Sequence, residues 1–152
     1  MTELMSNWPP HLTVATIVER DGRFLMVEEH QLGRLVLNQP AGHLEPGETL
    51  LAAAVRETRE ETGWEVSLDA ITGIYHYTVP EAGITYHRIT FAAAPVAHVT
   101  SRLDPDINAA LWLSLDEIRA RQADHRSPTV MRCLQDHADG HRYPLALLQH
   151  LD

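Results

Sequence analysis

Residues 42–64, GHLEPGETLLAAAVRETREETGW, carry the strongest structural signal of the chain. Its second half, residues 49–62, is rich in Ala, Leu, Glu and Arg, which favour the α-helix. Thr49 can supply a side-chain oxygen to the first helical turn, and Gly63 stands where a left-handed residue commonly ends a helix. The stretch therefore predicts a loop, a helix over residues 49–62, and a second turn.

Three glutamates of this helix, Glu57, Glu60 and Glu61, are placed against its stability. Their spacing brings like charges together, which costs about 0.2–0.5 kcal/mol per pair. They also lie near the C-terminal end, where the helix dipole disfavours acids. A solvated charged face is the ordinary explanation, and Arg56 can pair with Glu60. A divalent cation such as Mg²⁺ or Mn²⁺ would relieve the repulsion, so the cluster is a candidate metal site.

The buried face of the helix follows from a wheel of about 100° per residue. Leu51, Val55, Thr58 and Thr62 share one narrow sector and are expected to be buried. The three glutamates fall on the other side.

The rest of the chain predicts a mixed α+β fold. Runs rich in β-branched residues indicate strands over residues 11–19, 23–29, 34–37, 71–80, 84–94 and 110–113. Asp21-Gly22 is a strong hairpin signal. Ser114 and Glu117 have capping-box spacing and open a short helix to about residue 121, and Ser127-Pro128 opens another to about residue 137. These elements predict an α/β sandwich with a mixed sheet.

Length and charge narrow the class of protein. The 152 residues suit one domain, 1–152. There are 12 Arg, no Lys and 21 acids, and the net charge of −9 argues against a nucleic-acid polymer as partner. The lone Cys133 permits no internal disulfide. No signal peptide and no apolar run of about 20 residues is visible, so a cytoplasmic protein without membrane partners is expected.

Residues 42–64 resemble the Nudix box, G-x5-E-x7-R-E-U-x-E-E-x-G-U, in which U is a large aliphatic residue. The matching positions are Gly42, Glu48, Arg56, Glu57, Glu60, Glu61 and Gly63. Thr58 and Trp64 stand where an aliphatic residue is usual, on the packing side. The resemblance implies the Nudix fold, a mixed β-sheet between helices with the box as loop–helix–loop. It also implies a Mg²⁺- or Mn²⁺-dependent hydrolase that cleaves a diphosphate bond.

The same resemblance implies roles for the matched residues. The metal ligands would be Gly42 through its carbonyl oxygen, Glu57, Glu60 and Glu61. Glu57 or Glu61 would also act as the base that activates water. Glu48 would bind metal or hold Arg56, and Arg56 would orient the carboxylates through hydrogen bonds. A bound metal would neutralise the diphosphate oxygens and lower the pKa of the attacking water.

Further segments, 38–45, 126–128, 132–133 and 142–145, look like the NudJ-type phosphatases of this family. They imply a small diphosphate-containing substrate, a nucleoside di- or triphosphate or hydroxymethylpyrimidine diphosphate, with release of phosphate. One alternative is a sanitising pyrophosphatase that releases pyrophosphate from oxidised nucleoside triphosphates. Another is a nucleotide-sensing Nudix domain without turnover. A monomer and a homodimer are both compatible with the sequence.

Six side chains are candidate substrate contacts: Arg88, His43, Gln39, Arg34, Tyr86 and Asp106. Arginine suits two-point contacts with phosphate, although Arg88 could equally pair with an acid. Tyr75, Tyr77 and Tyr86 could stack on a heterocycle or belong to the core. Asp106 would be an extra metal ligand from outside the box, or simply part of the turn at Asp104-Pro105-Asp106.

Overall fold

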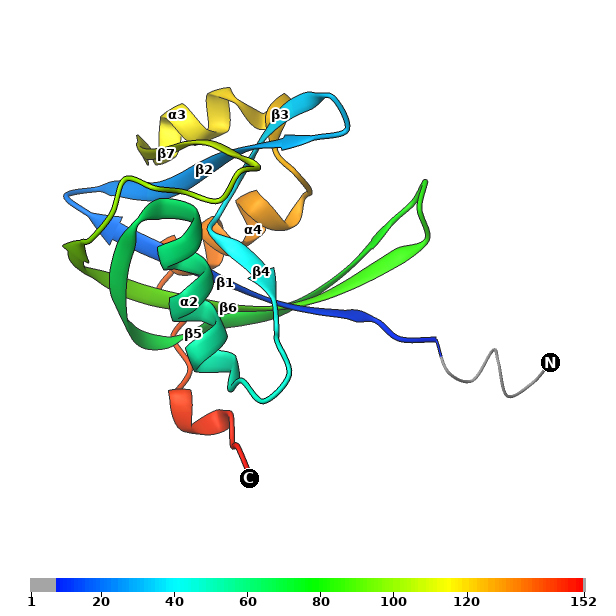
Figure 1. The fold of residues 1–152 in the computed structure, drawn as a ribbon, viewed down its shortest axis with the longest axis vertical. Coiled ribbons are helices and arrows are strands. Elements are labelled where there is room, and N and C mark those ends of the chain that lie inside the picture. Colours follow the sequence, from blue (N-terminus) through cyan, green and yellow to red (C-terminus); the bar gives the residue numbers. More distant parts are fainter. Residues whose placement is uncertain (1–7, 152) are drawn as a thin grey trace.

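The computed structural model describes residues 8–151 and shows one mixed sheet between helices (Figure 1). Residues 1–7, in which no signal peptide is expected, and residue 152 lie outside the described residues. The strands are β1 His11–Arg20, β2 Arg23–Gln31, β3 Arg34–Asn38, β4 Ala41–His43, β5 Trp64–Val79, β6 Ile84–His98 and β7 Ile107–Ser114. The helices are α2 Leu50–Thr62, α3 Leu115–Ala120 and α4 Thr129–Ala138, with single 3₁₀ turns η1 Gln122–Asp124 and η2 Leu145–Leu147.

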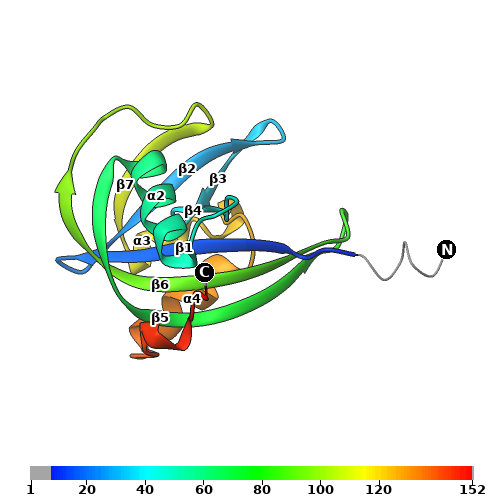
Figure 2. The ribbon, with the colours of Figure 1, turned by 60° about the horizontal axis from the view of Figure 1, so that its bottom comes forward.

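The sheet order confirms the predicted α+β fold. The main path runs β3-β2-β1-β6-β5, while β4 pairs with β1 and β7 pairs with β2. β1 and β6 are parallel, and the other pairs are antiparallel. Helix α2 lies on one side of the sheet, and α3 and α4 lie on the other (Figures 1 and 2).

Separate hydrophobic clusters hold the two layers to the sheet. On one side, Ala53 and Ala54 of α2 pack with Val14 and Phe91. On the other side, residues of α3 and α4 pack with β1, β2 and β3: Ile17, Phe24, Met26, Leu37, Ile118, Val130, Cys133 and Leu134. Both faces of the central strands are therefore buried, and the functional residues gather beyond these cores.

Helix α2 has the predicted ends. The Thr49 side chain accepts a hydrogen bond from the Ala52 N–H, and Gly63 has a left-handed φ of 77°. The predicted buried face is partly wrong, because Leu51 and Val55 are only half-buried and Glu61 is buried at 8% exposure. The small side chains Ala53 and Ala54 let the helix approach β1 and β4 closely, which turns the Glu61 side of the helix inward.

Two strands differ from the sequence prediction. β5 begins at Trp64 rather than at residue 71, and its pairing with β6 is interrupted by three register shifts. These irregularities break the alternation of polar and apolar residues by which strands are recognised. The short strand β4 was predicted as loop, because three residues around a glycine carry no strand pattern.

The two positions that depart from the Nudix box are explained by packing. The Thr58 hydroxyl is fully buried, donates to the Ala54 carbonyl at 2.7 Å and lies 2.7 Å from the Thr16 hydroxyl of β1. Trp64 packs edge-on against Trp112, and the Arg20 guanidinium lies 5.0 Å and 4.4 Å from the two ring centroids. Each departure is thus matched by a packing partner on a different element of the fold.

None of the helices in the described part of the chain combines the length and the hydropathy that a membrane span requires.

Candidate active site

Strand β4 brings the backbone of the glycine-containing loop directly beneath α2. Gly42 pairs with Val14 of β1, and a Cβ at Gly42 would lie 2.1 Å from the carboxyl carbon of Glu57. One turn further along α2, the Glu61 carboxylate accepts a hydrogen bond of 2.8 Å from the Ala41 N–H. Because glycine has no side chain, two glutamates of one helix can reach the same strand.

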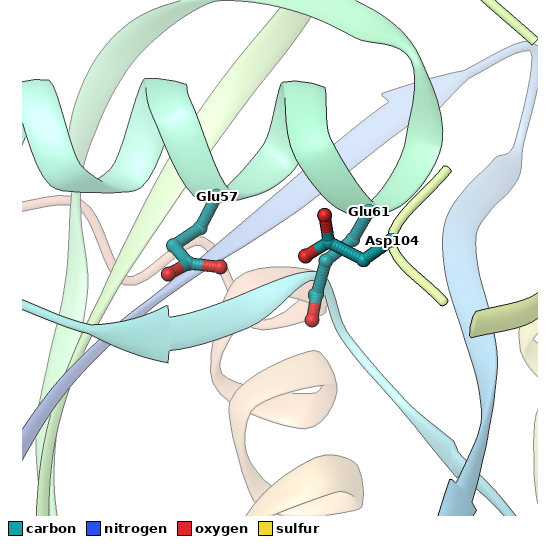
Figure 3. Close-up of side chains that lie close together, drawn as sticks. All are labelled: Glu57, Glu61 and Asp104. Atoms are coloured by element: carbon teal, nitrogen blue, oxygen red, sulfur yellow. The ribbon is translucent and has the colours of Figure 1, made fainter. Parts of the chain in front are cut away.

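An aspartate from a distant loop completes a group of three acids, which we call the acid triad: Glu57, Glu61 and Asp104. One carboxylate oxygen from each lies within 4.8 Å of the others (Figure 3). The loop between β6 and β7 delivers Asp104, whose N–H donates to the Glu60 carbonyl at 3.0 Å. An all-oxygen donor set of this kind fits a hard divalent cation such as Mg²⁺ or Mn²⁺.

The raised pKa values of the two glutamates of the acid triad also fit a cation site. Burial raises the pKa of Glu61 to about 9, and the neighbouring carboxylates Glu29, Glu57 and Asp104 add to the rise. Burial likewise raises the pKa of Glu57. Carboxyl groups that resist ionisation because they are buried near like charges become favourable ligands once a cation compensates them.

Arg56 donates hydrogen bonds to Glu57 of the acid triad and to Glu48 and Glu60, which lie outside it. Its guanidinium donates to both Glu48 oxygens at 2.6 and 2.9 Å and to Glu57 at 3.0 Å. It also donates to Glu60 at 3.1 Å and to the His43 carbonyl at 3.1 Å. The Arg56 guanidinium lowers the pKa of Glu48, so that carboxylate stays ionised. Glu48 and Glu60 therefore lie against Arg56, whereas Glu57 is shared by Arg56 and the acid triad.

A cavity of about 600 Å³ opens beside the acid triad, with Glu57 and Glu61 in its wall. Its floor is a row of neighbouring residues across four strands, Tyr75, Arg88, Thr13 and His43, because these pair in register. Tyr77 and Tyr86 pair with each other one step further along β5 and β6. β2, β3 and residues 125–129 form the opposite side.

Arg88 on the cavity floor is fixed by hydrogen bonds to two buried amide side chains. It is 8% exposed, and it donates to the side-chain oxygens of Gln39 and Asn38 at 3.0 Å each. Gln39 in turn donates to the Val130 carbonyl of α4 at 2.8 Å. Gln39 is fully buried at 0% exposure and is not among the residues that line the cavity, so the structure does not bring it to the predicted substrate contact. Its amide positions Arg88 instead.

Of the other predicted contacts, the structure brings Arg88, His43, Arg34 and Tyr86 to the same cavity. Asp106 does not reach it. The tight turn in which the Ile107 N–H bonds to the Asp104 carbonyl leaves Asp106 exposed and Asp104 facing the glutamates. The sequence offers both aspartates as candidates for the site, and the direction of the turn determines that Asp104 is the one that reaches the glutamates.

Sequence reasoning missed a further polar group on the cavity wall. Arg126 donates to Glu29 at 2.9 Å, and Asn38 donates to the same oxygen at 3.3 Å. Asn38 and Arg126 belong to segments that carried a family resemblance, and this was the signal that could have found them. Glu29 ends a strand pattern and gave no such signal.

Comparisons with known proteins found similar sequences and similar folds. The family model described as the NUDIX domain matches residues 9–133. Phosphatase NudJ of Escherichia coli strain K12 is 38% identical over 140 residues, which is 91% of this chain and 90% of the relative. The structure of a NUDIX hydrolase from Nitrosomonas europaea has a TM-score of 0.92 at 48% identity and covers 94% of this chain and 98% of its own. The Ap4A hydrolase of C. elegans, at 17% identity and a TM-score of 0.67, shares the fold.

Proposed function

Because the chain belongs to the Nudix hydrolase family and is a phosphohydrolase, we propose that it releases phosphate from a small nucleotide-like diphosphate. The substrate would be a nucleoside di- or triphosphate or hydroxymethylpyrimidine diphosphate. One observation carries the proposal: Glu57 and Glu61 of the acid triad stand in the wall of a cavity whose floor presents the fixed guanidinium of Arg88. The relatives named as phosphatases support phosphate as the product.

The residues present fit a Mg²⁺ or Mn²⁺ ion. Glu57, Glu61 and Asp104 would hold it, with the Gly42 carbonyl oxygen as a further ligand. Glu60, the other ligand expected from the resemblance, would join only by leaving Arg56. When bound, the ion supplies neutralisation of the diphosphate oxygens and a lower pKa for the attacking water.

The chain's own residues account for binding and proton transfer. Arg88 binds non-bridging oxygens of the diphosphate, since a guanidinium can donate two parallel hydrogen bonds. A water oxygen attacks the terminal phosphorus, and the bond from that phosphorus to the bridging oxygen breaks. The water proton passes to the carboxylate of Glu57 or Glu61, and the bridging oxygen leaves with the rest of the substrate, a phosphomonoester from a diphosphate or a nucleoside diphosphate from a triphosphate. Arg56, anchored by Glu48, keeps Glu57 in place for this step.

The test is a panel of nucleoside di- and triphosphates and hydroxymethylpyrimidine diphosphate, assayed for phosphate with Mg²⁺, with Mn²⁺ and with EDTA. Glu57→Gln and Glu61→Gln are expected to lower kcat by about 10²–10⁴-fold, as for loss of a general base. Glu65→Gln is the matched control, because Glu65 pairs with Arg59 at 3.2 Å outside the cavity.

Parallel assays with and without inorganic pyrophosphatase distinguish the products. Phosphate that appears without pyrophosphatase supports the proposal. Phosphate that appears only with it shows a pyrophosphate-releasing enzyme. If nucleotide binds but no member of the panel is cleaved, the sensing domain without turnover is the better description.

A further inference from the structure

The turn between β2 and β3 contains an unusual backbone conformation. Leu32 has a φ of 49° and Gly33 a φ of 78°, the two-residue hairpin turn in which both central residues need positive φ. The turn between β1 and β2 has the same form, with φ of 52° at Asp21 and 75° at Gly22. Asp is favoured at this position, whereas a bulky leucine is strained there by its Cβ.

Within residues 8–151, no packing compensates for the choice of leucine. Leu32 is 98% exposed, more than any other exposed large hydrophobic residue of the described part of the chain. Packing within the protein therefore gives no reason for an apolar side chain at a strained position. Strain of this kind is often retained where a residue contacts a ligand.

Leu32 lies at the rim of the cavity that contains the acid triad's glutamates. Tyr77 and Tyr86, on the β5–β6 hairpin, line the other side of the same cavity. Both hairpins extend beyond the body of the molecule on the same side (Figures 1 and 2). An aliphatic side chain on one hairpin and two aromatic side chains on the other thus line the same cavity.

Strand geometry places these tyrosines one step from the row of floor residues that includes Arg88. Tyr86 and Tyr77 are two residues along their strands from Arg88 and Tyr75. Two residues of a strand span about 7 Å. A diphosphate held at Arg88 therefore leaves the organic part of a small substrate between the tyrosines and Leu32.

We propose that Leu32 is a specificity-determining residue that covers one face of a heteroaromatic ring, whose other face lies on Tyr77 and Tyr86. This inference rests on the proposed function and adds how the substrate's ring is recognised. A ring between an aliphatic and two aromatic side chains is shielded from water on both faces, which favours it over a substrate without a ring.

The experiment compares adenosine diphosphate with methyl diphosphate, which has the same diphosphate and no ring. Leu32→Asn accepts the positive φ, so this variant folds and its Tm rises by about 2–4 °C. Its preference for adenosine diphosphate, as the ratio of the two kcat/KM values, is expected to fall about tenfold through KM. Leu32→Met keeps an apolar side chain and should retain most of the preference. Asp21→Asn, in the equivalent turn outside the cavity, is the matched control and should leave both values unchanged.

Each outcome decides the role of Leu32 separately from the proposed function. If Leu32→Asn melts higher and keeps the preference, or loses activity equally on both substrates, the inference is overturned. If the wild type cleaves neither compound with Mg²⁺ or Mn²⁺ nor any other diphosphate of the panel, the proposed function fails. Calorimetric binding of adenosine diphosphate to the wild type and Leu32→Asn then decides the inference: weaker binding by the variant supports it, and equal binding overturns it.

Discussion

Replacing Gly42 by alanine tests the position of the Glu57 carboxylate in a variant whose fold should be unchanged. Gly42 is not among the glycines with positive φ, so its backbone accepts an alanine. In a strand, Gly→Ala at a compatible φ is neutral or stabilises by up to about 1 kcal/mol. The added methyl group, however, would lie 2.1 Å from the Glu57 carboxyl carbon and 2.3 Å from both of its oxygens.

The size of the effect follows from these distances. Ordinary contact begins at 3.4 Å, so a carboxyl at 2.1 Å must retreat by about 1.3 Å. The side chain of Glu57 can rotate to do so, and the fold is spared. A misplacement of about 1 Å in a catalytic group can cost about 10²-fold in rate, or about 2.7 kcal/mol of transition-state stabilisation.

Two measurements on Gly42→Ala check this. Phosphate release with Mg²⁺ should fall about 10²-fold, while thermal unfolding should give a Tm within about 4 °C of the wild type. Glu57→Ala provides the background for a double-mutant cycle. In that background, Gly42→Ala should have little further effect, because the carboxyl that the methyl group displaces is gone.

A fully active Gly42→Ala protein would contradict this prediction, since the position of the Glu57 carboxylate against β4 would then be irrelevant to the chemistry. Loss of activity together with a collapse in Tm would also refute it, because the methyl group would then disturb the fold rather than one side chain. An unchanged penalty in the Glu57→Ala background would place the damage elsewhere.

Three other predictions concern the surroundings of the site. Arg56→Lys keeps the charge but not the two-point contact with Glu48, made at 2.6 and 2.9 Å, so kcat should fall about tenfold or more in the phosphate assay. Thr58→Val leaves the Thr16 hydroxyl without its buried partner and should lower the free energy of unfolding in urea by about 1–3 kcal/mol, and the double variant with Thr16→Val should recover most of it. Burial, with the neighbouring Arg142, lowers the pKa of His137, so its contribution to stability is present above about pH 6.5 and lost as the pH falls through the folded-state pKa. His137→Gln should therefore show a shallower loss of stability between about pH 7.5 and 5.

Local signals in the sequence were sufficient for the elements whose ends are chemically marked. Thr49 and Gly63 mark α2, and the structure shows both caps as predicted. Ser114 and Glu117 form the predicted capping box of α3. These signals act over a few residues, so they need no knowledge of the tertiary fold. The start of β5 and the existence of β4 depend on pairing with other strands, so the local sequence pattern does not predict either of them.

The same distinction applies to the cavity. Spacing along one helix was enough to bring Glu57 and Glu61 together. Asp104 joins them through a loop whose direction depends on a hydrogen bond to the Glu60 carbonyl, and the sequence pointed instead to Asp106. The strain at Leu32 was equally hidden, because Leu-Gly has neither of the residue pairs by which such turns are usually recognised.

The acids of the Nudix box show why their spacing alone could not assign their roles. The helical wheel put three glutamates on one side of α2, yet the structure gives each a different environment. Glu60 lies on the surface against Arg56, Glu57 lies between Arg56 and Gly42, and Glu61 is buried on the Ala41 N–H. One helix thereby holds Glu57 and Glu61, whose pKa values are raised, within one turn of Glu60, which is paired with Arg56. Separation of this kind lets neighbouring carboxylates perform different tasks. The glutamates belong to α2, but their different environments are set by β4 and Arg56. Contacts with these two groups therefore determine the role that each glutamate can have.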